Sequence, residues 1–138
     1  MERKRVLVLS LKSQWFEMIK SGEKREEYRE LNAYWLSRFC HIKKYKAQAI
    51  LRAQAVLLEP KTIICSFNSV LKDIPIEQYI YLLLEQNFDY EEIEFTLGYP
   101  SKDDSERRMI KKIKSIRIDE GKEEWGAEKG KKYFVISF

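Results

Sequence analysis

Cysteine and histidine are scarce in this chain, and their scarcity limits the chemistry that the protein can carry out. The 138 residues contain two cysteines, Cys40 and Cys65, and one histidine, His41. A structural zinc site needs about four such ligands, so we expect no bound metal. Cys40 and His41 are adjacent in sequence and point apart, which disfavours a catalytic Cys–His pair. We therefore expect both cysteines to be small core residues without a disulfide.

Glycine, proline and long hydrophobic runs are also few. Five glycines and three prolines exclude a collagen-like or low-complexity chain. No apolar run approaches the roughly 18 residues that span a bilayer. After the basic residues near the start, the apolar stretch ends at Lys12, which is too short for a signal peptide. Gly-rich phosphate loops and catalytic triads are absent too. These absences favour a cytoplasmic protein with no membrane partner and no cofactor.

The composition that remains is that of one folded domain. Hydrophobic residues make up 44% of the chain and aromatic residues 13%, which is enough to build a core. Charged residues reach 35%, and the net charge of +4 is a mild positive bias. Such a bias permits a polyanionic partner such as a nucleic acid but does not require one.

Hydrophobic patterning predicts an α+β fold. A buried strand leads into a helix that Ser13 can cap and Gly22 can end, and Asn32 can cap a second helix. An apolar stripe from Ile76 to Leu84 indicates the clearest amphipathic helix. Irregular spacing in the segment 107–118 predicts a bulge or bend. The expected strands are 6–11, 23–29, 62–67, 93–97, 107–118 and 133–138, with helices beginning near residues 13, 32, 47 and 75.

The expected strand at 23–29 is almost entirely polar, which is unusual for a strand. It brings Lys24, Glu27 and Arg29 within six residues of one another. Such a segment is either a solvated edge strand with cross-strand ion pairs or the wall of a polar site.

These polar residues carry a resemblance to a known family. Gly22, Lys24, Glu27 and Arg29 match the pattern Gly-x-Lys-Thr-x-Glu-x-Arg, with Arg25 where Thr is usual. In this pattern the chain resembles the ASCH family, a branch of the PUA-like folds. The resemblance extends over residues 6–45 and 90–138, including the segments 124–127 and 133–136, while the stretch of about 46–89 looks like an insertion.

The resemblance implies both a fold and a function. It implies one ASCH/PUA-like domain over residues 1–138, built as a small β-barrel with flanking helices and a helical insertion at about 46–89. Members of the family are proposed to bind RNA, in a cleft beside the first helix. Some members are amidohydrolases that remove the acetyl group from acetylated cytidine, and at least one is reported as a ribonuclease. The partner is thus expected to be RNA, a nucleotide or a modified nucleoside.

The candidate catalytic residues are Lys24, Glu27 and a late glutamate. Burial would favour a neutral Lys24 amine, which can take a proton from water. Glu27 stands where the amidohydrolase members carry Thr, so their hydroxyl nucleophile is missing here, and this favours binding over catalysis. The late glutamate of those members is best matched by Glu123 or Glu124. A metal-free ribonuclease is the other enzymatic alternative.

The candidate binding residues combine cations with aromatic rings. Arg29 can fork onto a phosphate or a carbonyl. Lys24 is the second candidate cation, and its ammonium would bind as a point charge. Trp125 either stacks on a base or seals one end of the barrel. Tyr28 and Tyr99 are further candidates for stacking, whereas Trp15 and Trp35 are expected in the core because they belong to apolar helical stripes.

Two basic segments are the last feature of the sequence. Residues 41–58 carry four cations and no acid, and residues 102–118 carry seven cations against three acids. Each segment is either a solvated face or a surface that contacts phosphates. A third hypothesis makes the chain a protein-interaction domain that uses the 46–89 insertion.

Overall fold

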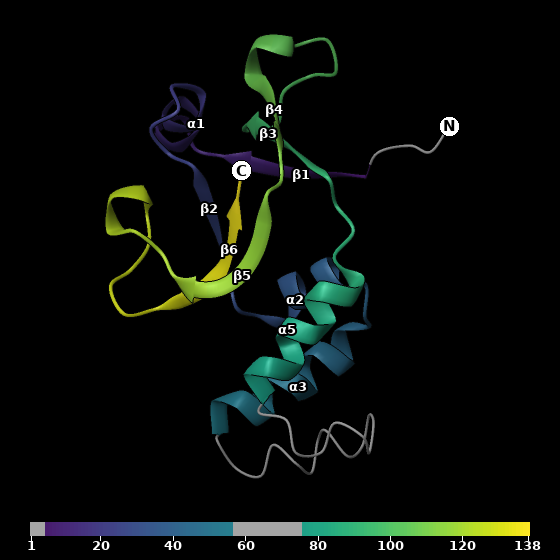
Figure 1. Ribbon diagram of the computed structural model, residues 1–138. Coiled ribbons are helices and arrows are strands. Elements are labelled where there is room, and N and C mark those ends of the chain that lie inside the picture. The colour runs from purple at the N-terminus through teal and green to yellow at the C-terminus, as the bar shows by residue number, and fades with distance from the viewer. Residues whose placement is uncertain (1–4, 57–75) are drawn as a thin grey trace. The chain divides into compact units, whose positions relative to one another are not determined.

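The computed structural model describes residues 5–56 and 76–138, and the chain divides into two compact units. One unit combines Met1–Arg29 with Asp89–Phe138, and the other is Glu30–Phe88. The described residues form both helices and strands (Figure 1), so the α+β class is confirmed. Their strands form two three-stranded sheets and no closed barrel. The single domain expected from the length stays a prediction.

The first sheet has the order β1-β3-β4 and contains β1 (Val6–Leu11), β3 (Glu92–Leu97) and β4 (Arg108–Lys112). β1 runs parallel to β3, with Leu7 opposite Ile93 and Leu9 opposite Phe95, and β4 is antiparallel to β3. These four apolar side chains are buried. Only every second residue of β1 is therefore directed into the core, so the strand that was expected to be buried is exposed on its other face.

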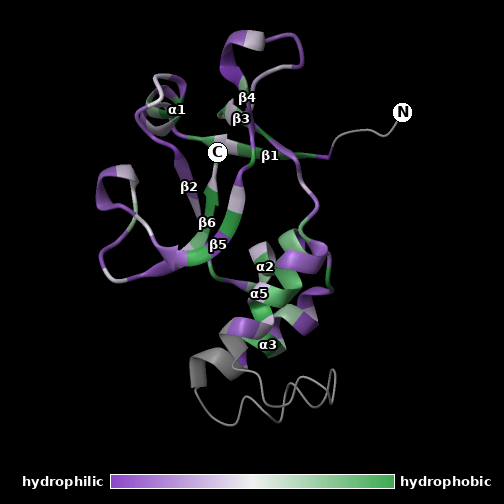
Figure 2. Ribbon diagram, in the orientation of Figure 1, coloured by the Kyte–Doolittle hydropathy of each residue, from purple (hydrophilic) through white to green (hydrophobic). Residues whose placement is uncertain are grey.

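The second sheet has the order β2-β6-β5 and contains β2 (Glu26–Glu30), β6 (Lys132–Ser137) and β5 (Ser115–Glu120). The central strand β6 buries Tyr133–Ile136 in succession. β2 is hydrophilic along its length, whereas β6 is largely hydrophobic (Figure 2). The polar segment is thus an edge strand, and it begins at Glu26 rather than at residue 23.

The expected strand at 107–118 is two strands that belong to different sheets. β4 ends at Lys112 and pairs with β3, whereas β5 begins at Ser115 and pairs with β6. The irregular spacing of its isoleucines thus marks a change of sheet, a stronger break than the predicted bulge. The chain therefore passes from the first sheet to the second between Lys112 and Ser115.

Helix α1 (Ser13–Lys20) joins the two sheets through a turn. Its buried residues are Phe16 and Ile19, and Gly22 follows its end with φ of +87°. Ser13 was expected to cap this helix, but it is the first helical residue, and the capping position is Lys12 without a side-chain hydrogen bond. Residues 21–25 then return the chain to β2, with the Lys24 N–H donating to the carbonyl of Met18.

The second unit is helical in its described part. It contains α2 (Ala33–Cys40), α3 (Lys44–Val56) and α5 (Ile76–Asn87), which pack on one another. The Asn32 side chain caps α2 by accepting from the Trp35 N–H, as predicted. Its core contains Leu36, Phe39, Cys40, Ala47, Ile50, Tyr79, Ile80 and Leu84.

The sequence predictions for the helical unit are confirmed in part. The apolar stripe of α5 is confirmed, since Tyr79, Ile80 and Leu84 are buried. The unit begins at Glu30, so it includes α2 as well as the insertion expected at 46–89. Three predictions lie outside the described residues: the strand at 62–67, the core position of Cys65 and the start of a helix near residue 75. No helix of the described residues is long and apolar enough to cross a membrane.

Candidate functional site

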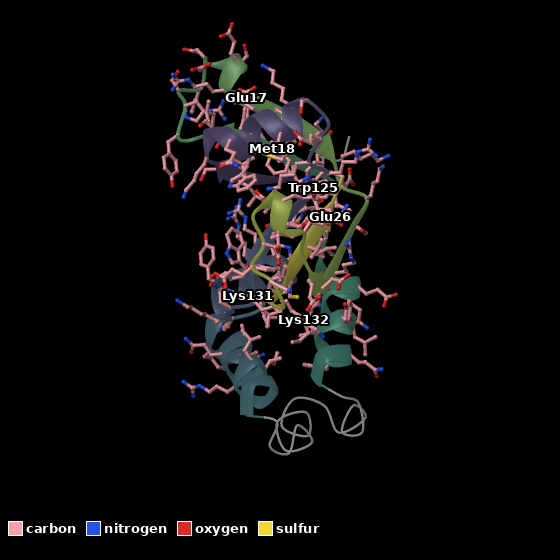
Figure 3. All side chains as sticks on the ribbon, turned by 90° about the vertical axis from the view of Figure 1, so that its left-hand side faces the viewer. Glu17, Met18, Glu26, Trp125, Lys131 and Lys132 are labelled. Carbon is pink, nitrogen blue, oxygen red and sulfur yellow. The ribbon has the colours of Figure 1, made fainter. Side chains whose placement is uncertain are left out.

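A cleft of about 430 Å³ lies in the unit that contains the two sheets. It is bounded by the end of β1, the start of α1, the strand β2 and the short helical turn η3 (Glu123–Trp125). Figure 3 labels Trp125, at the end of η3, and Met18 of α1. The lining residues are Ser10, Leu11, Lys12, Trp15, Lys24, Glu27, Tyr28, Arg29, Trp125, Gly126 and Tyr133.

A buried ion pair forms the base of the cleft. The Lys24 ammonium donates to Glu27 Oε1 over 2.8 Å. Lys24 is 1% exposed and Glu27 5%, so the pair is almost fully removed from water. Glu27 Oε1 also accepts from the Tyr28 N–H, and Oε2 lies 3.4 Å from Arg29 Nη2. The carboxylate therefore holds two cations and one backbone donor in place, which offsets the cost of burying it.

Aromatic rings enclose the Lys24 ammonium on its other sides. Its Nζ lies 4.8 Å from the centroid of the Trp15 ring and 5.8 Å from that of Tyr28. Both distances fall within the range of a cation–π contact. Lys24 consequently holds Glu27 and the neighbouring rings together and presents almost no surface to a ligand.

Glycine at position 126 lets the Trp15 indole approach the backbone. Gly126 has φ of +102°, a conformation that disfavours other residues. A β-carbon added there would lie 2.9 Å from the Trp15 ring. The indole therefore lies against this turn, which places the Trp15 ring beside the loop that carries Trp125.

Tyr28 is fixed by hydrogen bonds at its hydroxyl. The hydroxyl donates to Glu26 Oε1 and accepts from the Lys122 N–H, each over 2.9 Å. Burial raises the pKa of Tyr28 well above its ordinary value, with the neighbouring Glu26 adding to the effect, so the phenol stays neutral. Glu26 is itself paired with Arg117 of β5.

The accessible cations of the cleft are Arg29 and Lys12. Arg29 Nη2 donates to the Ser10 carbonyl over 3.3 Å, and the side chain is 21% exposed. Lys12 is exposed at the start of α1. The cleft therefore combines three cations with one carboxylate, and this excess of positive charge favours an anionic ligand.

The structure brings together most of the residues that the sequence singled out. Five of these candidates line the cleft, namely Lys24, Glu27, Tyr28, Arg29 and Trp125. The other two candidates, Glu124 and Tyr99, do not line it.

Glu124 is exposed on the turn η3, as is its neighbour Glu123, and neither lines the cleft. Tyr99 follows β3 and is 95% exposed, away from the other candidates. A glutamate next to Trp125 in sequence is therefore not next to it in the site.

The sequence analysis missed Lys12 and Trp15, which both line the cleft. For Trp15 the sequence held a signal. Trp15 was expected in the core, yet it is partly exposed and lines the cleft. Phe16 and Ile19 form the buried stripe of α1, and Trp15, one position earlier, points about 100° away from Phe16. Two adjacent aromatic residues in a short helix cannot share one face, and this was the available signal.

The second basic segment contributes to a smaller hollow in the same unit. Lys111 and Lys114 line a space of about 210 Å³ together with Arg25 and the stem of Lys24. The Lys24 ammonium itself is engaged by Glu27. Among the described residues no group of His, Cys, Asp and Glu side chains is arranged to hold a metal ion.

Comparison of the chain with family models, with curated proteins and with solved structures finds no match.

Proposed function

We propose that this chain is an ASCH-like, PUA-related domain whose cleft binds a nucleotide, either within RNA or free, or a modified nucleoside. The observation that carries the proposal is the lining of the cleft, in which four aromatic rings and three cations surround one carboxylate. Its volume of about 430 Å³ is in the range of small-molecule sites. A base needs a flat apolar surface and a phosphate needs donors, and this lining offers both.

Each part of a nucleotide has a partner in this proposal. Trp125 and Trp15 offer ring surfaces on which a base can stack. Arg29 and Lys12 offer charged donors to a phosphate, and the Arg29 guanidinium is held in place by Glu27 and Ser10. Glu27 acts as the support of the cations, because both of its oxygens are already engaged.

Titration with the four ribonucleoside monophosphates and with acetylcytidine tests the proposal. Two of the three tryptophans line the cleft, so a stacked base should quench the intrinsic fluorescence. Trp125→Ala should weaken binding by about 1–3 kcal/mol, the usual worth of one stacked base. Arg29→Gln should reduce the affinity for the monophosphates more than the affinity for the corresponding nucleosides.

Matched controls come from the two candidates that lie away from the cleft. Tyr99→Ala removes an exposed aromatic ring and Glu124→Gln an exposed charge, and both should leave affinity unchanged. Failure of every monophosphate and of acetylcytidine to bind the wild type at millimolar concentration would overturn the proposal.

The hydrolase alternative depends on Lys24 acting as a base. Lys24 is 1% exposed and its Nζ is engaged by Glu27, so it offers almost no surface to an attacking water. We therefore expect little or no release of acetate from acetylcytidine by the wild type. Steady turnover that Lys24→Arg abolishes while the fold is kept would instead support the amidohydrolase, since a guanidinium stays protonated.

A further inference from the structure

The segment that runs through α2 and α3 carries charge of one sign. Residues 31–56 contain five Lys and Arg residues and no Asp or Glu. Four of these cations, Lys43, Lys44, Lys46 and Arg52, are exposed. None of the four forms an ion pair with a carboxylate of the described residues. Their positive charge is therefore open to an external partner.

The apolar side of α3 is already covered within its own unit. Ala47 is fully buried and Ile50 is 1% exposed, and the helix packs on α2 and α5. The cations consequently lie on the solvent side. A helix that binds a lipid surface needs a free apolar face beside its cations, and the described part of α3 has none.

Exposed aromatic rings accompany the cations. Tyr45 lies between Lys44 and Lys46 and is 63% exposed, so its ring is accessible beside the cations. On α2, Tyr34 is 53% exposed, and its hydroxyl accepts from Arg38. Cations that neutralise phosphates and rings that stack on bases are the two components of a surface for single-stranded nucleic acid.

We infer that the α3 basic face, which consists of Lys43, Lys44, Tyr45, Lys46 and Arg52, binds a strand of single-stranded nucleic acid through its phosphates and one stacked base. The complementarity of charge carries the inference, and the exposed Tyr45 favours a strand with unpaired bases over a duplex. This face belongs to the helical unit, whereas the cleft belongs to the other unit. The inference therefore stands whether or not the cleft binds a nucleotide.

Fluorescence anisotropy with a labelled twelve-nucleotide oligouridine and the full-length protein tests the inference. The triple variant Lys43→Gln, Lys44→Gln, Lys46→Gln should lose at least tenfold in affinity at about 50 mM salt. Its plot of log affinity against log salt should be shallower by about 2, since each lost phosphate contact on a single strand removes about 0.7. Tyr45→Ala should weaken binding about fivefold or more, whereas Tyr45→Phe keeps the ring and should bind normally.

A second triple variant separates this surface from net charge. Lys20→Gln, Lys129→Gln, Lys132→Gln removes the same charge from exposed positions of the other unit. Equal weakening by both triple variants would overturn the inference, as would a twelve-base-pair duplex that binds as tightly as the single strand. Binding of the α3 residues to anionic vesicles or to an acidic peptide in place of oligouridine would also overturn it.

The two proposals fail in different ways. If the α3 triple variant reduces oligouridine binding while no monophosphate binds, the cleft proposal alone is wrong. If monophosphates quench the tryptophans while the triple variant binds oligouridine normally, the inference about α3 alone is wrong. Circular dichroism of each variant shows whether the helices are intact.

Discussion

At the scale of single residues, the Lys24–Glu27 pair determines how the cleft can be tested. Both side chains are almost fully buried and 2.8 Å apart. Removing Glu27 leaves the Lys24 ammonium as an unpaired buried charge, and removing Lys24 leaves the buried Glu27 carboxylate with Arg29 as its one cation. Either change costs more than the pair contributes when intact. A loss of function in Lys24→Ala would therefore report on stability as readily as on catalysis.

The pair predicts a non-additive effect on stability. Lys24→Met and Glu27→Leu should each reduce the free energy of unfolding by about 3–5 kcal/mol. The double variant should be more stable than either single variant, because neither almost fully buried charge of the pair then remains. Urea denaturation of all four proteins measures the cycle, with Lys20→Met, at an exposed position, as a control within about 0.5 kcal/mol of wild type. Additive losses in the double variant would contradict a coupled pair.

Tyr28 predicts a loss of stability in alkali. Burial raises its pKa in the folded protein above the ordinary value, so above about pH 10 the unfolded chain releases a proton that the folded protein retains. The free energy of unfolding should therefore fall as pH rises beyond 10, by up to about 1.4 kcal/mol per pH unit from this group. Urea denaturation between pH 9 and 11 should show a steeper fall for the wild type than for Tyr28→Phe. Equal slopes would mean that Tyr28 titrates alike in both states.

At the scale of elements, the turn η3 and helix α1 are matched to each other through Gly126. Gly126→Ala places a methyl group 2.9 Å from the Trp15 ring, at a backbone φ of +102°. We expect a loss of about 1–2 kcal/mol from the backbone alone. The displaced indole should add a shift in tryptophan emission and weaker nucleotide binding.

Gly130→Ala is the matched control for this prediction. Gly130 has φ of +77°, but a β-carbon there meets no atom within 4 Å. It should lose stability for the same backbone reason while leaving the tryptophan emission and the affinity unchanged. If both variants change binding alike, the contact between Gly126 and Trp15 has no role in the cleft.

Local patterns predicted the elements, and contacts between distant segments decided what the patterns missed. The strand β1, the Asn32 cap and the stripe of α5 are local features, and each was found from the sequence. The change of sheet after Lys112 depends on which strands β4 and β5 pair with, which no local pattern contains.

The candidate site shows the same division. The wall with Lys24, Glu27 and Arg29 is one short segment, and the sequence identified it. Trp15 joins the site because its ring packs against Gly126, more than a hundred positions later in the chain. Glu124 lies outside the site because the turn η3 directs Trp125 toward the cleft and the glutamate toward solvent.

At the scale of the whole molecule, positive charge is divided between two units that have different surroundings. In the sheet unit two of the three cations of the cleft, Lys24 and Arg29, are buried or half-buried and contact Glu27, whereas Lys12 is exposed. In the helical unit the cations of the α3 basic face are exposed and have no described carboxylate partner. Salt screens exposed charges more than buried ones, so the two sites should respond differently to ionic strength.

This difference gives a prediction for the intact protein. Binding of a monophosphate to the cleft involves about one phosphate, so log affinity should fall with log salt with a slope of about −0.7 or less. A twelve-nucleotide strand that contacts three or more cations of the α3 basic face should give a slope of about −2 or steeper. Anisotropy for the strand and tryptophan quenching for the monophosphate, each between 50 and 300 mM salt, measure the two slopes on the same sample. Equal slopes would mean that the strand is held by the cleft alone, because only a second, exposed set of cations adds counterion release as the ligand lengthens.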